Sequence, residues 1–598
     1  MTKTTEPSGA GVEGGEVLSF DLTSQPWIGV LRCDGFQDEL SLRQVFGQAD
    51  GLRCVVGELA TQEFSLLRLL LAVAHDALDG PGGIEEWADL WEDPDCFAPV
   101  QAYLDGQRDR FDLLHPVAPF GQAAGLRTGK DEVFSLNRIV ADVPAGEPFF
   151  SARMPDVRRL SFAEAARWVV HVHAYDTSGI KSGMVGDDRV KGGRVYPLGT
   201  GWAGGLGGVF VEGATLRETL LLNLVAADTE LLEFAADDRP AWRREPCGPG
   251  SDGRSATGLR DLYTWQSRRV RLHHDADGVH GVVLGYGDPL VSRNMHRGEP
   301  MTAWRRSPAQ ERKLGQSPVF LPLEHDPARG AWRGIAALLA DRLESTGGAE
   351  GPSRLRPRIL EWVARLVTEG HLSRRFLVRT RVVGVRYGTQ QSVIDEVVDD
   401  RLEMPVVLLH AQDPAYAAQA IAAAEDADRA VRILGDLAAD LARARGSEQE
   451  GPKDVARAEG FDALDHAYRG WLSGMATATD PFEHRHTWQR QVRHTVGRLG
   501  DRLISAAGDA AWEGRIHTDQ KGGTHWLNAG LADVWFRGRL AKAVGDPDSR
   551  GASGSSSPSQ APDSGGKGTV SAEDVPPGPG PTGPTGTEYA AIDPEVHV

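Results

Sequence analysis

The chain lacks the sequence features of several common protein classes. Its 598 residues include only 4 cysteines, and no C-x-x-C pair occurs, which argues against a thiolate zinc site and a secreted disulfide scaffold. No apolar run approaches the length of about 18 residues that a membrane-spanning helix needs. Residues 1–16 contain no apolar signal segment. We therefore expect a soluble, cytoplasmic protein with no metal, no cofactor and no membrane partner.

Motifs of common enzyme families are also missing. The sequence contains no P-loop, no G-x-S-x-G nucleophile elbow and no H-E-x-x-H zinc motif. His171 and His173 are two positions apart on an expected helix, so they lie on different faces and could not share a metal ion. The sequence gives no positive support for catalysis.

A net charge of −19 discourages a nucleic-acid partner at first sight, but the charge is unevenly distributed. Residues 546–598 carry eight acidic and two basic residues, so −6 of the total lies in this tail. Residues 151–200 carry eight Lys/Arg against five Asp/Glu, and residues 291–315 carry six against two. Because salt screens charges over about 8–10 Å, a locally basic surface can still hold phosphate. The alternative is that each cluster is a solvated face.

The glycine stretch at residues 175–208 stands out, with eleven glycines in 34 positions. Glycine lets backbone amides approach a ligand closely, and the interleaved cations suggest that the ligand is anionic. These cations are Lys181, Arg189, Lys191 and Arg194. GTGWAG at 199–204 matches a dinucleotide-binding pattern, but an expected strand at 209–211 follows where a helix is required. A surface loop with turn glycines is the other interpretation.

The pattern along the chain predicts an α+β protein. We expect a disordered lead at 1–16, a large mixed N-terminal domain at 17–400, a C-terminal four-helix bundle at 405–545, and a disordered acidic tail at 546–598. The expected bundle helices lie at roughly 413–446, 453–476, 481–507 and 523–544.

Local signals predict several elements of the mixed domain. Thr61 is expected to cap an apolar helix, and Ser161 with Glu164 to form a capping box. A second box, at Thr215 and Glu218, precedes a helical stretch that reaches 234. Residues 265–287 predict a β-hairpin that turns at Asp277-Gly278, and the alternation over 269–272 predicts one polar and one apolar face on its first strand.

The order of these segments resembles the CasA family, the large subunit of the type I-E CRISPR surveillance complex Cascade. The resemblance rests on FDLTSQPWIGVL, ELSLRQVF, the TQ-headed helix at 61, FDLLHPVAPFGQ, GATLRETLLLNL, NMHRGEPMTAWR and the helical C-terminal region, and it covers roughly residues 17–545. It implies a non-catalytic subunit whose partners are the guide RNA, target double-stranded DNA, other Cascade subunits and a recruited helicase–nuclease. In that family the subunit checks the protospacer-adjacent motif (PAM), and guide pairing then reads the sequence.

The resemblance also implies site residues. A glycine loop that enters the minor groove matches DTSGIKSG, and its expected DNA contacts are Thr177, Ser178, Gly179 and Lys181. A glutamine wedge matches RYGTQQSVIDEV, with Gln391 as the best match beside Gln390 and Ser392. Arg293 is the expected basic finger, and a guide-RNA loop at 149–159 supplies Phe150 and Arg153. Some relatives carry zinc-type cysteines near that loop, but this chain has none, so no metal is expected.

Two other functions stay open from the residues alone. One is a cytoplasmic hydrolase or transferase that holds a phosphorylated small molecule in the glycine loop. The other is a scaffold protein whose basic loop has no ligand. Turnover of a small molecule would favour the first, and PAM-dependent duplex binding would favour the Cascade subunit.

Overall fold

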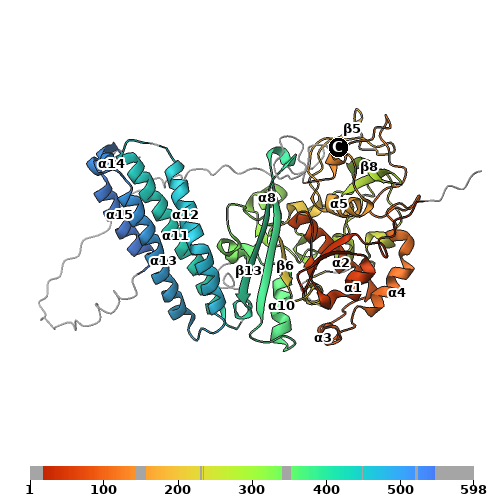
Figure 1. Cartoon of the computed structure of the whole chain (residues 1–598), viewed down its shortest axis with the longest axis horizontal. Coiled ribbons are helices and arrows are strands. Elements are labelled where there is room, and N and C mark those ends of the chain that lie inside the picture. Colours follow the sequence, from red (N-terminus) through yellow and green to blue (C-terminus); the bar gives the residue numbers. More distant parts are fainter. Residues whose placement is uncertain are drawn as a thin grey trace, which may run out of the picture.

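The computed structural model describes residues 18–141, 157–228, 232–233, 235–339, 352–410, 412–447, 449–518 and 523–545. Helices and strands are mixed up to residue 410, and long helices follow, which confirms the α+β fold class. Figure 1 shows the long strands β12 (Leu377–Tyr387) and β13 (Ile394–Pro405) between the C-terminal helices and the N-terminal α/β elements. No helix within these described ranges is long and apolar enough to cross a lipid bilayer.

Helix α2 (Ala60–Ala77) is the central core element of the N-terminal part. It is apolar on nearly all sides, as expected for a helix surrounded by protein, and it packs on α5 (Phe162–Tyr175) and α7 (Leu259–Tyr263). The prediction that Thr61 caps this helix is wrong. The helix begins one residue earlier, and the Thr61 hydroxyl instead lies 3.0 Å from His171 Nε2 of α5.

Smaller elements surround this core. The first sheet has the order β2-β1-β3, and the helices α1, α3, α4 and α6 lie around it and α2. Their bounds are β1 Ile28–Arg32, β2 Gln37–Leu40, β3 Leu52–Val55, α1 Leu42–Gly47, α3 Ile84–Glu92, α4 Ala98–Gly106 and α6 Leu216–Asn223. Thr215 caps α6 by accepting from the Glu218 N–H, but the Glu218 carboxylate accepts from the Ala214 N–H, so the predicted reciprocal box with Thr215 is not formed. The helix ends at Asn223, well before the expected 234.

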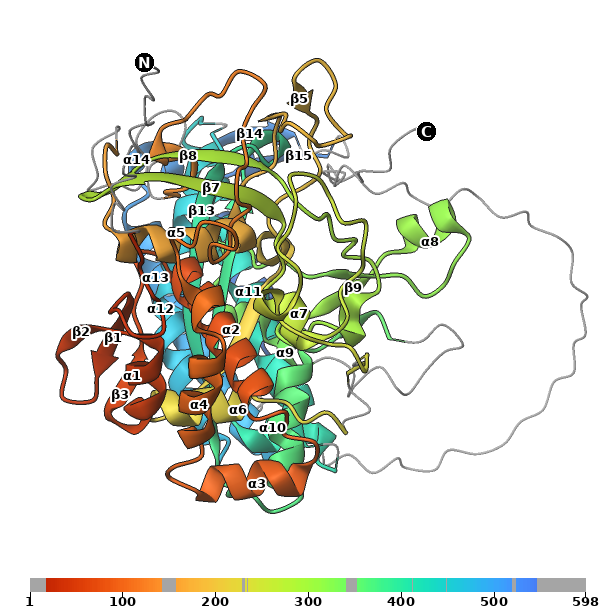
Figure 2. The ribbon, with the colours of Figure 1, turned by 90° about the vertical axis from the view of Figure 1, so that its right-hand side faces the viewer.

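The predicted hairpin at 265–287 is confirmed as β7 (Arg268–Asp275) and β8 (Gly278–Tyr286). Figure 2 shows this hairpin lying over α5, with the short β5 (Arg194–Val195) near the same end of the molecule. Strand β5 pairs with β4 (Lys181–Ser182). The capping box of Ser161 and Glu164 at the start of α5 is also confirmed.

A second sheet has the order β13-β12-β6, and its third strand is β6 (Gly208–Glu212). A small third sheet and three further helices complete the part before the bundle. Their bounds are β9 Trp304–Arg306, β10 Phe320–Pro322, β11 Arg354–Leu355, α8 Pro308–Leu314, α9 Ile335–Leu338 and α10 Arg358–Thr368.

The C-terminal region contains four long helices, close to the expected ranges. They are α11 Pro414–Ala444, α12 Gly451–Gly474, α13 Pro481–Ser505 and α15 Ala529–Ala543. Tyr468 and Trp488 contact each other in its core at 5.3 Å between ring centroids, and Trp332 stacks on Tyr468 at 4.6 Å. Residues 524–527 were expected to be helical, but they form β15 (Thr524–Leu527), paired with β14 (Arg515–Thr518) after the short α14 (Asp509–Glu513).

Candidate nucleic-acid interface

The loop at 175–183 starts where α5 ends, and a buried ionic cluster holds its first turn. Asp176 accepts a hydrogen bond from Lys181 Nζ at 2.6 Å and another from the Arg268 guanidinium of β7. Arg268 Nη2 also donates to the carbonyls of Asp176, Thr177 and Gly199 at 3.0–3.2 Å. The side chains of Asp176, Lys181 and Arg268 are 7%, 11% and 2% exposed. The cluster therefore fixes the loop backbone from beneath.

The same cluster sets the ionisation of Asp176. Burial alone would raise the pKa of this carboxyl, but the charges and hydrogen bonds of Lys181 and Arg268 outweigh burial and hold the pKa below its ordinary value. Because Lys181 is occupied in this way, it is a positioning residue for the loop in this structure.

The outward part of the loop is backbone at Gly179 and the exposed side chain of Ile180. Gly179 has φ +123°, a region that glycine adopts readily, and a Cβ built there would meet no heavy atom of other described residues, its chain neighbours aside, within 4 Å. Its carbonyl accepts a hydrogen bond from the Tyr286 hydroxyl at 2.6 Å. Thr177 is half-buried, and Ser178 is buried, so the Ser178 hydroxyl does not lie on the surface.

The turn between β12 and β13 reaches this loop. The Ser178 N–H donates to the Gln391 carbonyl at 2.8 Å, and the Tyr387 hydroxyl donates to the Tyr175 carbonyl at 2.8 Å. Gln390 and Gln391 both have positive φ, 57° and 56°, which is uncommon for residues other than glycine and costs about 1–3 kcal/mol per residue. Two predicted segments that are far apart in sequence thus form one junction.

The side chains at this turn are available to a ligand. Gln390 and Ser392 are exposed and Gln391 is half-buried. Within the described part of the chain, neither glutamine side chain makes a hydrogen bond, whereas the Ser392 hydroxyl donates to the Thr389 carbonyl at 2.8 Å. Beside the junction lies a cavity of about 460 Å³, lined by Gly179 and Ser392 and by residues 137–141.

The cations of the glycine stretch divide into two pairs. Lys181 is in the buried cluster, and Arg189 binds Asp187 and the carbonyls of Tyr286 and Gly287. Lys191 and Arg194 are exposed on the β4–β5 hairpin, and Arg194 is the register partner of Ser182. Within the described residues, neither Lys191 nor Arg194 has a side-chain ion pair. Sequence reasoning recognised all four as cations of one stretch, but it had no signal to separate the exposed pair from the internal pair.

The remaining predicted site residues lie elsewhere. Arg293 is half-buried in the segment between β8 and β9, and among the described residues no hydrogen bond or ion pair joins it to the loop or the β12–β13 turn. Phe150 and Arg153 of the expected guide-RNA loop lie outside the described residues.

The GTGWAG segment is internal and does not form a nucleotide cradle. A Cβ at Gly201 would lie 2.4 Å from the Ala174 carbonyl carbon, so this glycine permits close packing against the end of α5. Trp202 Nε1 donates to Glu299, which also pairs with the buried Arg68 at 2.8 Å. The segment packs inside the protein against the end of α5, where the glycine loop begins. Within the described ranges, no group of three or more His, Cys, Asp or Glu residues is placed to hold a metal ion.

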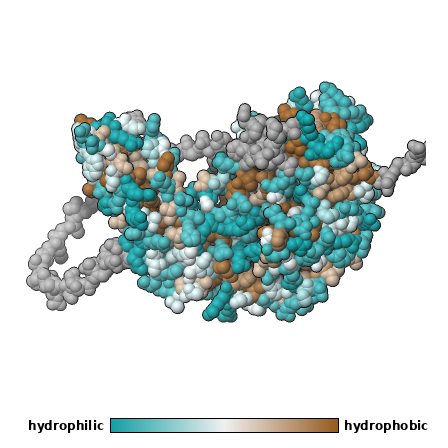
Figure 3. All heavy atoms as spheres, viewed as in Figure 1, coloured by the Kyte–Doolittle hydropathy of each residue, from teal (hydrophilic) through white to brown (hydrophobic). Residues whose placement is uncertain are grey.

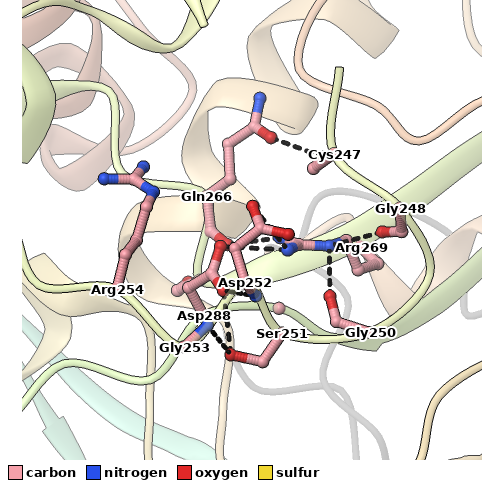
Figure 4. Close-up of polar contacts among 12 residues, drawn as sticks. Cys247, Gly248, Gly250, Ser251, Asp252, Gly253, Arg254, Gln266, Arg269 and Asp288 are labelled. Atoms are coloured by element: carbon pink, nitrogen blue, oxygen red, sulfur yellow. Dashed lines mark hydrogen bonds and ion pairs between the residues drawn. The ribbon is translucent and has the colours of Figure 1, made fainter. Parts of the chain in front are cut away.

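The prediction that Arg269 lies on a polar face of β7 is wrong. Its side chain is fully buried, and Figure 4 shows the guanidinium between the loop at 247–253 and Asp288. It donates to the carbonyls of Gly248 and Gly250 and binds the Asp288 carboxylate at 2.9 Å. The preceding arginine, Arg268, points to the opposite side of the strand and holds the glycine loop, so β7 fixes two loops at once.

The chain is similar to known proteins in both fold and sequence. The solved structure of Thermobifida fusca Cse1 is 55% identical, with a TM-score of 0.81, and the match covers 88% of this chain and 98% of that one. A curated CasA/Cse1 protein from Thermus thermophilus is 30% identical over 337 residues, which span 54% of this chain and 61% of the relative. A chain of a structure described as a CRISPR RNA-guided surveillance complex has a TM-score of 0.57 at 19% identity, covering 82% of this chain and 99% of that one, and shares the fold.

The family follows from the sequence match as well. The family model described as CRISPR-associated protein Cse1 matches residues 21–499. This chain belongs to the CRISPR-associated Cse1 family, as the resemblance to CasA predicted.

Proposed function

We propose that this chain is the non-catalytic large subunit of a type I-E Cascade complex, and that it recognises the PAM in double-stranded DNA. The complex would contain guide RNA and the other Cascade subunits and act in the cytoplasm. The subunit would help to open the duplex for guide pairing and recruit the helicase–nuclease. Membership of the Cse1 family and the fold shared with a surveillance-complex chain support this proposal.

One observation supports the DNA-reading role most strongly, the junction of the glycine loop and the β12–β13 turn. It joins residues 212 and 213 positions apart, through the Tyr175 and Gln391 carbonyls. A narrow strip of backbone at Gly179 suits the minor groove, which is only about 6 Å wide. The adjacent glutamine side chains make no hydrogen bond within the described residues, so they are free to insert at a duplex end.

In this proposal each part has its own task. Gly179 and Ile180 enter the groove, and Thr177 lies beside them. Gln391 is the wedge, flanked by Gln390 and Ser392, and it offsets unstacking of a few kcal/mol per base step. Ser178 and Lys181 position the loop. Phosphates are held by Lys191 and Arg194, in addition to Arg293. Phe150 and Arg153 are proposed contacts of the guide RNA.

The test is Gln391→Ala in the assembled complex with guide RNA. Loss of the wedge should weaken binding to a PAM-containing duplex at least tenfold, about 1.4 kcal/mol, while size-exclusion chromatography shows unchanged assembly. Gln37→Ala, an exposed glutamine on β2, is the matched control and should bind as the unsubstituted complex does. Equal affinity of Gln391→Ala and the control would refute the wedge assignment.

A further inference from the structure

An exposed apolar surface lies at the end of the helical bundle, outside the matched residues 21–499. Its members are Trp512 of α14, Ile516 of β14, Trp526 of β15 and Val534 of α15. Their exposed fractions are 51%, 66%, 55% and 67%, which is unusual for such large apolar side chains. We call these four residues the terminal apolar surface. Figure 3 shows apolar atoms at the α14 end of the molecule.

The four side chains are held close together by their elements. Ile516 and Trp526 are direct register partners on the β14–β15 hairpin. The Trp526 indole N–H donates to the Glu513 carbonyl at 3.0 Å, which places its ring beside the residue that follows Trp512. A Cβ at Gly530 would lie 4.0 Å from the Trp512 ring, and Val534 follows one turn later on α15. The surface is therefore continuous across four elements.

The two tryptophan rings are free for stacking. Among the described residues, neither ring makes a contact with another aromatic ring, and the Trp526 N–H is already used internally. Exposed aromatic faces with a neighbouring aliphatic side chain resemble the grooves that bind polyproline II segments, in which proline rings stack on the aromatic rings.

This chain itself contains such a segment. Residues 575–586 read VPPGPGPTGPTG, with prolines three positions apart at Pro576/Pro579 and Pro581/Pro584. A polyproline II helix has three residues per turn with a rise of about 3.1 Å, so each pair presents two rings on one face about 9 Å apart. Proline fixes φ near the polyproline II value, so five of the twelve residues are restricted before binding.

The segment can reach the surface from where α15 ends. Thirteen residues of α15 separate Gly530 from Ala543, a length of about 20 Å. The 30 residues from 546 to 575 would span about 30 Å as a flexible coil. The reach exceeds the distance, so the effective concentration of the tail at the surface is in the millimolar range.

We propose that the proline-rich segment at 575–586 docks on the terminal apolar surface of its own chain. Stacking of its proline rings on Trp512 and Trp526, with Ile516 and Val534 alongside, covers apolar area that otherwise faces water. The docked tail occupies this end of the bundle and competes with any proline-rich partner for it. This inference is independent of DNA recognition.

The experiment uses the full chain with all five prolines of the segment replaced. The substitutions are Pro576→Ala, Pro577→Ala, Pro579→Ala, Pro581→Ala and Pro584→Ala. A fluorescent peptide of residues 575–586 should bind this variant, and its affinity is measured by fluorescence anisotropy. It should bind the unsubstituted chain about tenfold more weakly, because a millimolar tail competes with a peptide whose Kd is about 100 μM. Replacement of Pro558 and Pro562, outside the segment, should leave the weak binding unchanged.

Surface variants identify the site. Trp526→Ala in the proline-free chain should abolish peptide binding, and Val534→Ser provides a second variant that leaves the hairpin intact. Phe36→Ala, which removes an exposed aromatic ring in the β1–β2 turn, should have no effect. Absence of binding to the proline-free chain would overturn the proposal. Equal binding to the proline-free and unsubstituted chains would also overturn it, since the surface would then take a segment of another protein.

Discussion

The outward backbone of the glycine loop gives the sharpest prediction of the DNA-reading proposal. Gly179→Ala adds one methyl group at a point where, beyond its chain neighbours, no heavy atom of the described residues lies within 4 Å. The substitution therefore creates no internal clash. Its cost to folding is only the strain of an alanine at φ +123°, about 1–3 kcal/mol.

The chain offers a matched control for this strain. Gly35, in the turn between β1 and β2, has φ +94° and equally open surroundings. Gly35→Ala should lower the free energy of unfolding by a similar amount, but it lies away from the loop and the β12–β13 turn. Comparison of the two variants separates backbone strain from contact with DNA.

The two variants should differ in duplex binding. In Gly179→Ala the added methyl group must fit into a groove about 6 Å wide, so we expect PAM-dependent affinity to fall at least tenfold, about 1.4 kcal/mol. Gly35→Ala should bind within twofold of the unsubstituted complex. Affinity is measured with labelled duplexes on the assembled complex at fixed salt. If Gly179→Ala binds as tightly as Gly35→Ala, the loop does not enter the groove.

Three further predictions concern the buried Asp176, the exposed cations Lys191 and Arg194, and the buried histidines. Asp176→Asn leaves Lys181 and Arg268 without a buried counter-charge and should lower the free energy of unfolding by about 3–5 kcal/mol. Asp501→Asn, at an exposed pair with Arg537, should cost less than about 1 kcal/mol, and equal midpoints in urea would contradict this contrast. The double variant Lys191→Ala/Arg194→Ala should reduce the slope of log affinity against log salt by about 2, whereas Arg374→Ala, at an exposed position just before β12, should not. An unchanged slope in the double variant would exclude phosphate contacts there. Burial lowers the pKa of His75 and His171 to about 3 and of His173 to about 4. Because these histidines stay neutral when folded, stability is full above about pH 6.5 and is lost as the pH falls toward those values. Each should cost roughly 2 kcal/mol at pH 5, and urea midpoints that agree at pH 7 and pH 5 would refute this.

Sequence signals predicted the elements that depend only on residues close together in the chain. The capping box of Ser161 and Glu164 joins neighbouring residues. The hairpin follows from glycine beside a period-two pattern, although its turn lies at Ala276–Asp277, one residue before the expected Asp277-Gly278. Thr61 had the right type for a cap, but a long-range contact with His171 uses its hydroxyl instead. Whether a residue caps or packs depends on what lies beside it in three dimensions.

The site required information that a sequence pattern does not contain. Alternation along β7 separates Arg268 from Arg269, yet both are buried, because loops from elsewhere in the chain cover both sides of the strand. The contact between Ser178 and the Gln391 carbonyl joins remote backbone atoms and leaves no residue-type signature. The same is true of Lys181, whose charge is paired with Asp176, five positions earlier. The resemblance to CasA named the two segments, and the structure shows that they lie in contact.

The most direct test of the account is to locate residue 391 relative to the DNA. A photo-crosslinking amino acid at position 391, in the complex assembled with guide RNA and a PAM-containing duplex, should attach to the base pairs at the PAM. The yield should fall strongly on a duplex without a PAM. Crosslinks that go only to protein subunits, or that are equally strong without a PAM, would contradict the assignment of this turn as the wedge.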